Sequence, residues 1–443
     1  MSDTSGSTSE RASEPTSGAA CVRTASWRHI GPGVVVAATG VGAGDLVATL
    51  IAGSEFGYTL LWAAVVGCLV KISLAEAVGR WHLATGRTLF EGWRTLGGWT
   101  TWYFSGYVVV WGFVYGATAM SASALPLVAL FPDLWGLKTW AVLCGLTGLV
   151  FVWYNRYAVF EKVMTVLVGV MFVTTVYLAA RVSPNLGDAL AGLVPVLPDG
   201  SLIYTLGLIG GVGGTVTMAA YGYWINAKGW TDTGWLRVMR LDNRVAYLTT
   251  GVFVIAMLFV GAELLHSTGI ALSTGSTGLV DLGDVLADRY GDATARLFLI
   301  GFLATSFTSL IGVWHGVSLL FADFVENVRA GTAGDRGAGV SESVAEVADG
   351  RAERSPAFRA YLLWLTFPPM CLLWLDQPFA LVIGYGVLGA FFLPFLALTL
   401  LWLLNSGRTP RAWRNGALSN VMLFAAGVLF LVLCVQEISD LDW

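Results

Sequence analysis

Charged residues are scarce in this sequence. Asp, Glu, Lys and Arg together make up 12% of its 443 residues, whereas 56% of the residues are hydrophobic. A soluble domain carries about 25% charged residues. A soluble protein of this length could not bury so much apolar surface, so lipid must surround most of the chain. The formal net charge of −4 is small and gives no indication of a nucleic-acid partner.

The signatures of several other protein classes are also missing. We find no nucleotide-binding motif, nucleophile elbow or metal-protease signature, so we expect neither an enzyme nor a cofactor. The five cysteines form no close pair and no metal-type spacing, and four lie in apolar runs where packing explains them. Residues 1–26 hold no apolar stretch that could act as a cleavable signal peptide, and their small polar composition predicts a disordered tail over residues 1–28.

Long apolar runs, in contrast, are abundant. A helix needs about 20 apolar residues to cross a bilayer. Eleven runs meet this length, at residues 30–52, 58–79, 102–125, 137–154, 163–181, 202–224, 245–265, 295–323, 358–375, 378–404 and 416–436. The sequence therefore predicts an all-α membrane protein with eleven transmembrane helices.

The positions of Lys and Arg predict the orientation of these helices. With the N-terminus in the cytoplasm, the tail and the loops on its side carry 20 of the 25 Lys and Arg residues. The loops on the other side carry four, and Lys71 lies inside a span. Cytoplasmic loops are enriched in positive charge. We therefore expect a multi-pass protein of the cell membrane with a cytoplasmic N-terminus and an outer C-terminus.

Two of the predicted spans are interrupted by glycine. The first contains Gly40, Gly42 and Gly44, and the sixth contains the run from Gly210 to Gly214. Glycine costs about 1 kcal/mol in a helix interior, and backbone groups freed in lipid must find new partners. Interruptions at matching positions of two five-helix halves are typical of inverted-repeat transporters. The alternative is that the glycines only permit close helix packing.

This pattern suggests a division of the chain. We expect the first five-helix repeat at residues 29–182, the second at 200–405 and an additional helix at 416–436. The second repeat contains a long polar loop at 326–357, which is rich in Gly, Ala, Glu and Arg and which we expect to be a flexible cytoplasmic linker.

The chain resembles the Nramp family of divalent-metal transporters. The resemblance rests on short motifs in the first, second and tenth spans. They are Gly31-Pro32-Gly33, Ala52-Gly53, Gly57-Tyr58, Leu60-Leu61-Trp62, Ala84-Thr85-Gly86 and Leu393-Pro394-Phe395. The resemblance implies a LeuT-type fold, with a 5+5 inverted repeat plus one helix and with broken helices one and six. It also implies transport of divalent cations.

The family's metal-binding motifs are altered in this sequence. The Asp-Pro-Gly-Asn motif of the first helix falls on Gly42-Ala43-Gly44-Asp45, and the Met-Pro-His motif of the sixth falls on Thr217-Met218-Ala219. The family's carbonyl ligand falls on Gly214. The third span, which is acidic in proton-coupled members, has no acidic residue here. The chain thus looks like a divergent branch, similar to Nramp-related proteins proposed to carry magnesium without proton coupling.

These replacements change the expected ligands. Sulfur ligands select softer metals, whereas carboxylate, carbonyl and hydroxyl oxygens suit Mg²⁺ and Mn²⁺. We expect Asp45 to supply the carboxylate, the carbonyls of Gly42 and Gly214 and the Thr217 hydroxyl to supply further oxygens, and Met218 to face the site if the register shifts by one. Asp45 is also a candidate N-cap for the second half of the broken helix.

Three other polar residues lie in predicted spans. Lys71 is a candidate partner for Asp45 or for Glu76, and Glu76 is also four residues before Arg80, a standard helix pair. A charge within the membrane suggests function unless it is paired. His315 follows Thr305, Ser306, Thr308 and Ser309 in the eighth span. A single buried histidine is more often a packing partner than a ligand.

The sequence leaves three functions open. The first is a monomeric transporter of Mg²⁺ or Mn²⁺ whose partners are the metal ion and the lipid bilayer. The second keeps the fold but carries an organic or amino-acid-like solute, with Lys71 as a fixed cation. The third is a non-transporting sensor that retained the fold.

Overall fold

The structure is a computed structural model. It describes residues 31–154, 157–182, 184–211, 213–266, 278–330, 351–375 and 378–439, apart from the side chains of some residues within helices. The predicted disordered tail at 1–28 lies outside these ranges. The two ends of the predicted linker at 326–357 are helical, and its residues 331–350 lie outside the described part.

The described part is helical. Its first half contains α1 (Pro32–Gly40), α2 (Ala43–Phe56), α3 (Leu61–Thr85), α4 (Leu89–Arg94), α5 (Gly98–Leu130), α6 (Leu137–Tyr154), α7 (Tyr157–Arg181) and α8 (Leu186–Ala191). Its second half contains α9 (Leu202–Gly211), η2 (Val216–Met218), α10 (Tyr221–Ala227), η3 (Thr233–Trp235), α11 (Leu236–Leu264), α12 (Gly278–Tyr290), α13 (Asp292–Ala330), η5 (Ala352–Arg354), α15 (Pro356–Thr366), η6 (Pro368–Leu375), α16 (Pro378–Asn405), η7 (Arg411–Trp413) and α17 (Ala417–Ser439).

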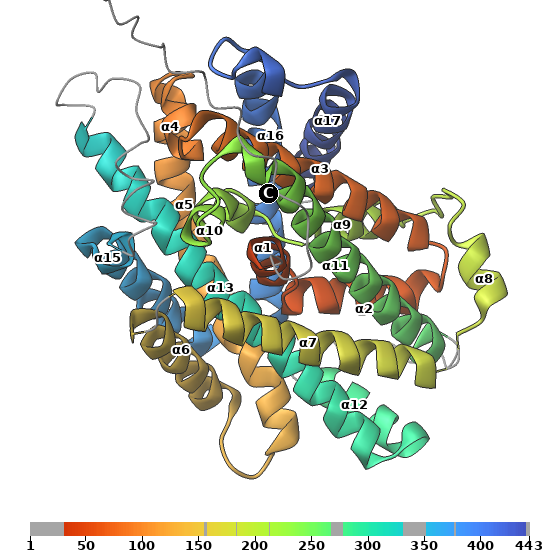
Figure 1. The fold of residues 1–443 in the computed structure, drawn as a ribbon. Helices are drawn as coiled ribbons and strands as arrows, with labels where there is room; N and C mark the ends of the chain where they lie inside the picture. The colour runs from red at the N-terminus through yellow and green to blue at the C-terminus, as the bar shows by residue number, and fades with distance from the viewer. Residues whose placement is uncertain are drawn as a thin grey trace, which may run out of the picture.

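Helix α1 lies in the middle of the bundle. In Figure 1 it is seen end-on, with α7, α11 and α13 around it, and it contacts each of these three helices. Its buried residues include Val35 and Val36, which are fully enclosed although the helix is only nine residues long. Because the centre of the bundle is covered on all sides by other helices, its backbone must find polar partners within the protein and not in lipid.

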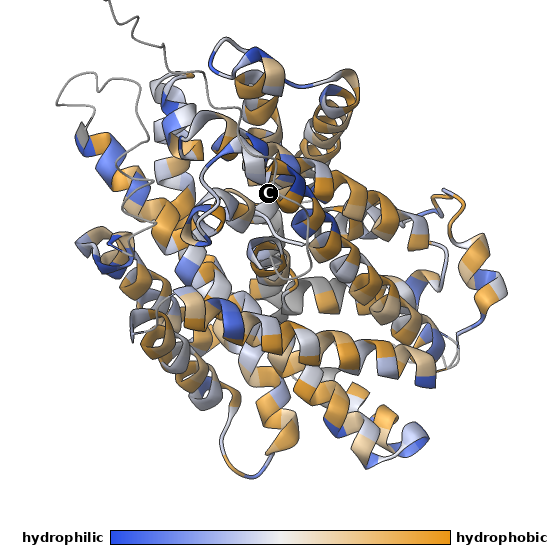
Figure 2. Cartoon of the chain, viewed as in Figure 1, coloured by the Kyte–Doolittle hydropathy of each residue, from blue (hydrophilic) through white to orange (hydrophobic). Residues whose placement is uncertain are grey.

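Within the described ranges, seven helices are long and apolar enough to cross a membrane, by length and composition. The other predicted spans correspond to the pairs α1–α2 and α9–α10 and to α16 and α17. Figure 2 shows hydrophobic residues along most of the helices and hydrophilic residues mainly at helix ends and in loops. The predicted all-helical membrane architecture is confirmed, and the count of eleven crossings stays a prediction.

Several elements differ from the predicted spans. The ninth span is not one α-helix: α15 ends at Thr366, and the chain continues from Pro368 as the 3₁₀-helix η6. Pro368 and Pro369 lack the N–H donors that an α-helix needs. The short helix α4 was not predicted, although Thr88 and Glu91 form a capping box at its start. The Thr-x-x-Glu pattern in the sequence is typical of a helix N-terminus and could have predicted α4.

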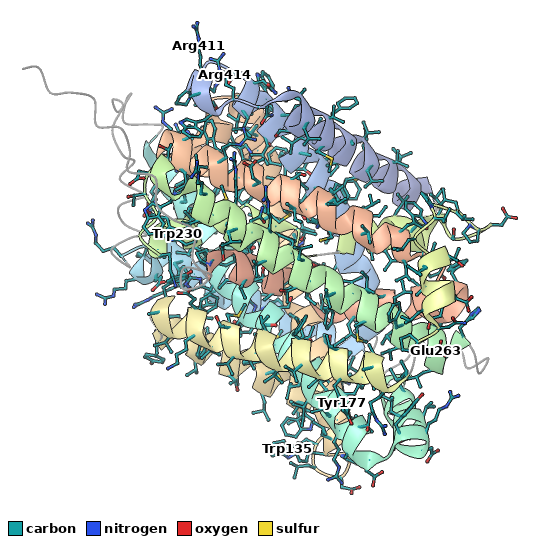
Figure 3. All side chains as sticks on the ribbon, turned by 45° about the vertical axis from the view of Figure 1, so that its right-hand side comes forward. Trp135, Tyr177, Trp230, Glu263, Arg411 and Arg414 are labelled. Atoms are coloured by element: carbon teal, nitrogen blue, oxygen red, sulfur yellow. The ribbon has the colours of Figure 1, made fainter. Side chains whose placement is uncertain are left out.

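The loops gather at two opposite ends of the bundle. Figure 3 shows Arg411, Arg414 and Trp230 toward one end and Glu263, Tyr177 and Trp135 toward the other. This is the division between the loops predicted as cytoplasmic and those predicted as outer. We will call these ends the arginine-rich end and the arginine-poor end.

Hydrogen bonds join loops within each end. At the arginine-rich end, the Arg408 guanidinium donates to the Thr95 carbonyl. At the arginine-poor end, the Tyr58 hydroxyl donates to Glu263 at 2.5 Å, and the Trp62 indole donates to the Val196 carbonyl at 3.1 Å. Trp62 lies in α3 and Glu263 in α11, so these contacts join loops or span ends that were predicted on the same side. They support the predicted alternation of the spans. The side that faces the cytoplasm stays a prediction.

Candidate functional site

The first predicted break lies between α1 and α2. Helix α1 ends at Gly40 and α2 begins at Ala43. Between them the Gly42 N–H donates to the Gly40 carbonyl at 3.0 Å, and the Gly42 carbonyl accepts the first bond of α2 from Leu46 at 3.1 Å. The interruption is therefore short, and it leaves two half-helices that point in from opposite ends.

The second break is longer and depends on glycine. Helix α9 ends at Gly211, and regular structure resumes at Val216 in η2. Gly213 and Gly214 have φ angles of +73° and +92°, in the left-handed region. Glycine enters this region without the steric cost that other residues carry. The glycines of the sixth span thus form the break itself.

The two breaks touch each other. A Cβ atom placed on Gly40 would lie 1.6 Å from the Gly214 nitrogen. A Cβ on Gly214 would in turn lie 3.4 Å from the Gly40 Cα. The predicted break and the alternative of close packing are both correct at these two residues, because the broken backbones are packed directly on one another.

Hydroxyl groups surround the first break. The Ser309 hydroxyl of α13 donates to the Thr39 carbonyl at 2.8 Å, and it lies 2.7 Å from the Tyr115 hydroxyl of α5. A Cβ on Gly42 would lie 2.9 Å from Ser309 Oγ. The polar run in the eighth span is therefore partly explained by backbone groups released at the break. No pattern in the sequence pointed to Tyr115.

The second break is held by a lysine and a tyrosine. The Lys71 ammonium of α3 donates to the Gly214 carbonyl. The Tyr247 hydroxyl of α11 donates to the neighbouring Gly213 carbonyl at 3.2 Å. Lys71 is fully buried, and its Nζ lies 5.7 Å from the centroid of the Phe430 ring. The carbonyl predicted as a metal ligand is thus in contact with a positively charged side chain.

Other predicted ligands lie close by. The Thr217 Oγ1 is 2.9 Å from the position a Cβ would take on Gly214, so its hydroxyl faces the break. Met218 is fully buried in η2. Asp45 belongs to the first turn of α2, where the partial positive charge of a helix N-terminus favours a carboxylate. The Asp45 side chain lies outside the described part of the structure.

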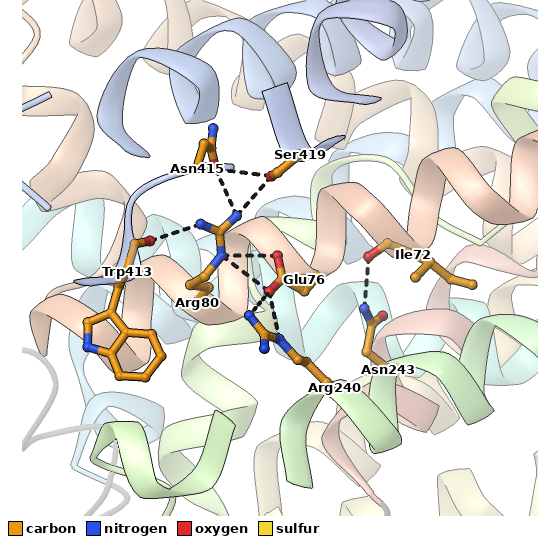
Figure 4. Close-up of polar contacts among 8 residues, drawn as sticks. All are labelled: Ile72, Glu76, Arg80, Arg240, Asn243, Trp413, Asn415 and Ser419. Atoms are coloured by element: carbon orange, nitrogen blue, oxygen red, sulfur yellow. Dashed lines mark hydrogen bonds and ion pairs between the residues drawn. The ribbon is translucent and has the colours of Figure 1, made fainter. Parts of the chain in front are cut away.

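Glu76 lies in an ion-pair cluster at the arginine-rich end. Its carboxylate is 3.1 Å from Arg80 Nε and 2.9 Å from an Arg240 guanidinium nitrogen. Arg80 also donates to the Trp413 carbonyl and to Asn415 (Figure 4). Glu76 therefore forms the predicted helix pair with Arg80. The cluster joins α3 to α11 and to the loop before α17.

His315 is a packing partner, as we expected. Its Nδ1 accepts a bond from the Trp224 indole at 3.0 Å, and its Nε2 lies 3.0 Å from Glu353. Its ring stacks on Phe160 with 4.3 Å between the centroids. Both nitrogens are occupied, so His315 joins α10 to α13 and η5.

No cluster of three or more His, Cys, Asp or Glu side chains that could hold a metal ion occurs among the described residues. Asp45 is the one carboxylate that the sequence predicted as a ligand at the breaks, together with neutral oxygen atoms. Such a ligand set is weaker in charge than a multi-carboxylate site.

A comparison with protein-family models identifies the chain. The model described as natural resistance-associated macrophage protein-like matches residues 33–440. The chain belongs to the Nramp family.

Two curated Nramp proteins illustrate the distance to known relatives. The divalent metal cation transporter MntH of Nostoc sp. is 25% identical over 328 residues, which cover 68% of this chain and 71% of that protein. The metal transporter Nramp3 of Arabidopsis thaliana is 26% identical over 313 residues, which cover 66% of this chain and 59% of Nramp3. The chain thus spans about three fifths of the length of the plant relatives it matches.

Solved structures show the same fold. The crystal structure of a mutant of the Eremococcus coleocola manganese transporter superposes with a TM-score of 0.75 at 16% identity, covering 96% of this chain and 88% of that one. The nucleobase-cation-symport-1 family transporter MHP1 gives a TM-score of 0.57 at 13% identity, covering 96% and 95%. The predicted LeuT-type fold class of this Nramp protein is confirmed.

Proposed function

We propose that this Nramp-family protein transports a hard divalent cation, Mg²⁺ or Mn²⁺, through the site where its two broken helices meet. The observation that carries the proposal is the contact between the breaks at Gly40 and Gly214. The Gly214 carbonyl and the Thr217 hydroxyl of the second break thus lie beside α1, and α2, with Asp45 in its first turn, follows α1 after a two-residue gap. Oxygen ligands of this kind suit Mg²⁺ and Mn²⁺.

The names of the relatives support the same class of substrate. The matched proteins of Nostoc and Arabidopsis are a divalent metal cation transporter and a metal transporter, and the solved Eremococcus protein is a manganese transporter. The position of the family's methionine is Thr217 in this chain, so we infer a preference for hard over soft cations.

We further propose that metal transport by this protein is not coupled to protons. Helix α5 corresponds to the third predicted span, and it contains no Asp, Glu or His over Gly98–Leu130. Its buried residue Tyr115, which contacts Ser309 beside the first break, bears a hydroxyl group. This helix therefore offers no carboxylate or imidazole for a proton relay.

Uptake into proteoliposomes tests the proposal. Purified protein should carry Mn²⁺ and Mg²⁺ inward without acidifying a lumen that contains a pH-sensitive dye. Asp45→Ala should abolish uptake, and Thr217→Ala should reduce it about tenfold, since one ligand is typically worth 1–2 kcal/mol. Thr249→Ala is the matched control, because that hydroxyl bonds the Val245 carbonyl of its own helix.

Two results would contradict the proposal. Metal uptake that is unchanged by Asp45→Ala would show that the metal does not bind at the breaks through Asp45. Uptake of neither metal would favour the second candidate, an organic or amino-acid-like solute. The specific observation in favour of that candidate is the Lys71 ammonium at the Gly214 carbonyl, because a fixed cation can pair with the carboxylate of such a solute. A non-transporting sensor predicts no flux of any solute.

A further inference from the structure

We propose that the Lys71 ammonium is a resident competitor for the transported cation: it binds the Gly214 carbonyl when the substrate is absent and leaves that carbonyl when the substrate binds. The inference rests on the proposed function. In this role, Lys71 sets the affinity for the cation. It also allows the empty transporter to reorient after the cation has been released.

The geometry places the ammonium at the breaks. Lys71 is near the middle of the 25-residue helix α3, and its fully buried side chain reaches the second break. The carbonyl it binds belongs to Gly214, whose backbone is in contact with Gly40 of the first break. The ammonium therefore occupies the place where a cation would bind a carbonyl of the sixth helix.

The Lys71 ammonium binds one carbonyl of the second break, and a neutral group binds the next one. The adjacent Gly213 carbonyl is bound by the neutral hydroxyl of Tyr247 at 3.2 Å. A neutral donor is thus sufficient for a carbonyl of this break. Burying an ammonium costs more free energy than burying a hydroxyl, even after partners are found. The presence of a charge suggests that the charge itself has a function.

The surroundings stabilise a cation at this place. The Phe430 ring of α17 lies 5.7 Å from Lys71 Nζ, within the range in which the face of an aromatic ring attracts a cation. The Gly214 carbonyl dipole adds a second attraction. A site that stabilises one cation in this way must release it before a second cation can use the same carbonyl.

Competition of this kind has two consequences. A divalent ion and an ammonium a few ångströms apart repel each other strongly at low dielectric constant, so bound substrate must displace the ammonium. After release of the substrate, the ammonium returns and compensates the charge of the oxygen ligands. The empty transporter can then reorient without carrying a second ion, which agrees with the proposed lack of proton coupling.

Two variants test the competition. Lys71→Met removes the charge and the donor, whereas Lys71→Gln removes only the charge and keeps an N–H donor for the Gly214 carbonyl. We expect both variants to bind Mn²⁺ about tenfold more tightly than the wild type in electron paramagnetic resonance titrations of the purified protein. Ser73→Ala is the control, since the Ser73 hydroxyl bonds the Leu69 carbonyl within α3.

Transport assays provide a second readout. Both variants should retain Mn²⁺–Mn²⁺ exchange across proteoliposomes, while net uptake into metal-free vesicles falls at least about fivefold, because only net uptake requires return of the empty transporter. Equal losses of exchange and net uptake in Lys71→Met, with wild-type behaviour in Lys71→Gln, would show a structural hydrogen bond and would overturn the inference. Unchanged Mn²⁺ affinity in both variants would also overturn it. Absence of Mn²⁺ binding and exchange in the wild type would instead overturn the proposed function.

Discussion

Gly40 shows how a single residue determines the geometry of the candidate site. Its missing side chain allows α1 to approach the second break so closely that a Cβ would lie 1.6 Å from the Gly214 nitrogen and 2.1 Å from the Gly213 carbonyl carbon. Both atoms belong to the backbone, so no side-chain rotation can relieve the overlap. The helices themselves would have to separate.

We therefore expect Gly40→Ala to destabilise the protein and to abolish transport. Overpacking of a well-packed interior costs about 1–3 kcal/mol. The thermal midpoint of the purified protein, followed by size-exclusion chromatography after heating, should fall by several degrees. Gly106→Ala is the matched control, because nothing lies within 4 Å of a Cβ at that position in α5. A Gly40→Ala variant as stable and active as Gly106→Ala would contradict the packing of the breaks.

At the scale of elements, Asp242 joins both broken helices to α11. Its carboxylate accepts the Gly31 N–H at 2.9 Å and the Gly33 N–H at 2.5 Å at the start of α1. It also accepts the Tyr221 hydroxyl of α10 at 3.3 Å. No pattern in the sequence indicated this residue, because the seventh span was predicted to begin at residue 245, three residues after Asp242.

Asp242→Asn should loosen the first turn of α1. The amide keeps one acceptor oxygen and presents an NH₂ group to one of the two backbone donors, so a buried N–H loses its partner at a cost of about 1–3 kcal/mol. Hydrogen–deuterium exchange should accelerate over residues 31–36. Asp232→Asn is a suitable comparison, because Asp232 accepts a local bond from Gly234 in a loop. Equal exchange over 31–36 in the two variants would argue against a capping role for Asp242.

The ion-pair cluster around Glu76 also acts between elements. It ties α3 to α11 through Arg240 and to the segment before α17 through Arg80. Glu76 was a candidate partner for Lys71 in the sequence. Glu76 lies at the arginine-rich end, four residues before Arg80 on the same helix face. Its carboxylate therefore pairs with Arg80 and Arg240.

At the scale of the whole molecule, the distribution of Arg residues bears on which end of the bundle faces the cytoplasm. The structure separates the loops into an arginine-rich and an arginine-poor end (Figure 3), and the enrichment of cytoplasmic loops in positive charge predicts that the first faces the cytoplasm. The same assignment would place the C-terminus outside the cell after eleven crossings.

Cysteine labelling in intact cells tests this topology. In a background in which Cys21 and the exposed Cys371 are replaced by serine, a membrane-impermeant maleimide should label Asp133→Cys but not Arg411→Cys until the cells are opened. Both positions are exposed, Asp133 in the loop before α6 and Arg411 at the start of η7, and they lie toward opposite ends of the bundle. Labelling of Arg411→Cys in intact cells would reverse the orientation, and labelling of both would contradict an odd number of crossings between them.

The sequence by itself determined that lipid surrounds most of the chain, and it determined most of the helices and the two interruptions. Its short motifs indicated the family. The helices and interruptions follow from local properties, which are apolar runs of about 20 residues and glycines within otherwise apolar helices. Each can be read from neighbouring residues, because a helix in lipid satisfies its backbone within its own segment.

Only the tertiary structure decided which side chains reach the breaks. Lys71 is 143 residues from Gly214 in the chain, and Tyr115 is 194 residues from Ser309. No local pattern encodes such pairs. They form because backbone groups released at the breaks cannot bond to lipid, and the donors and acceptors that satisfy them come from whichever helices the packing brings alongside.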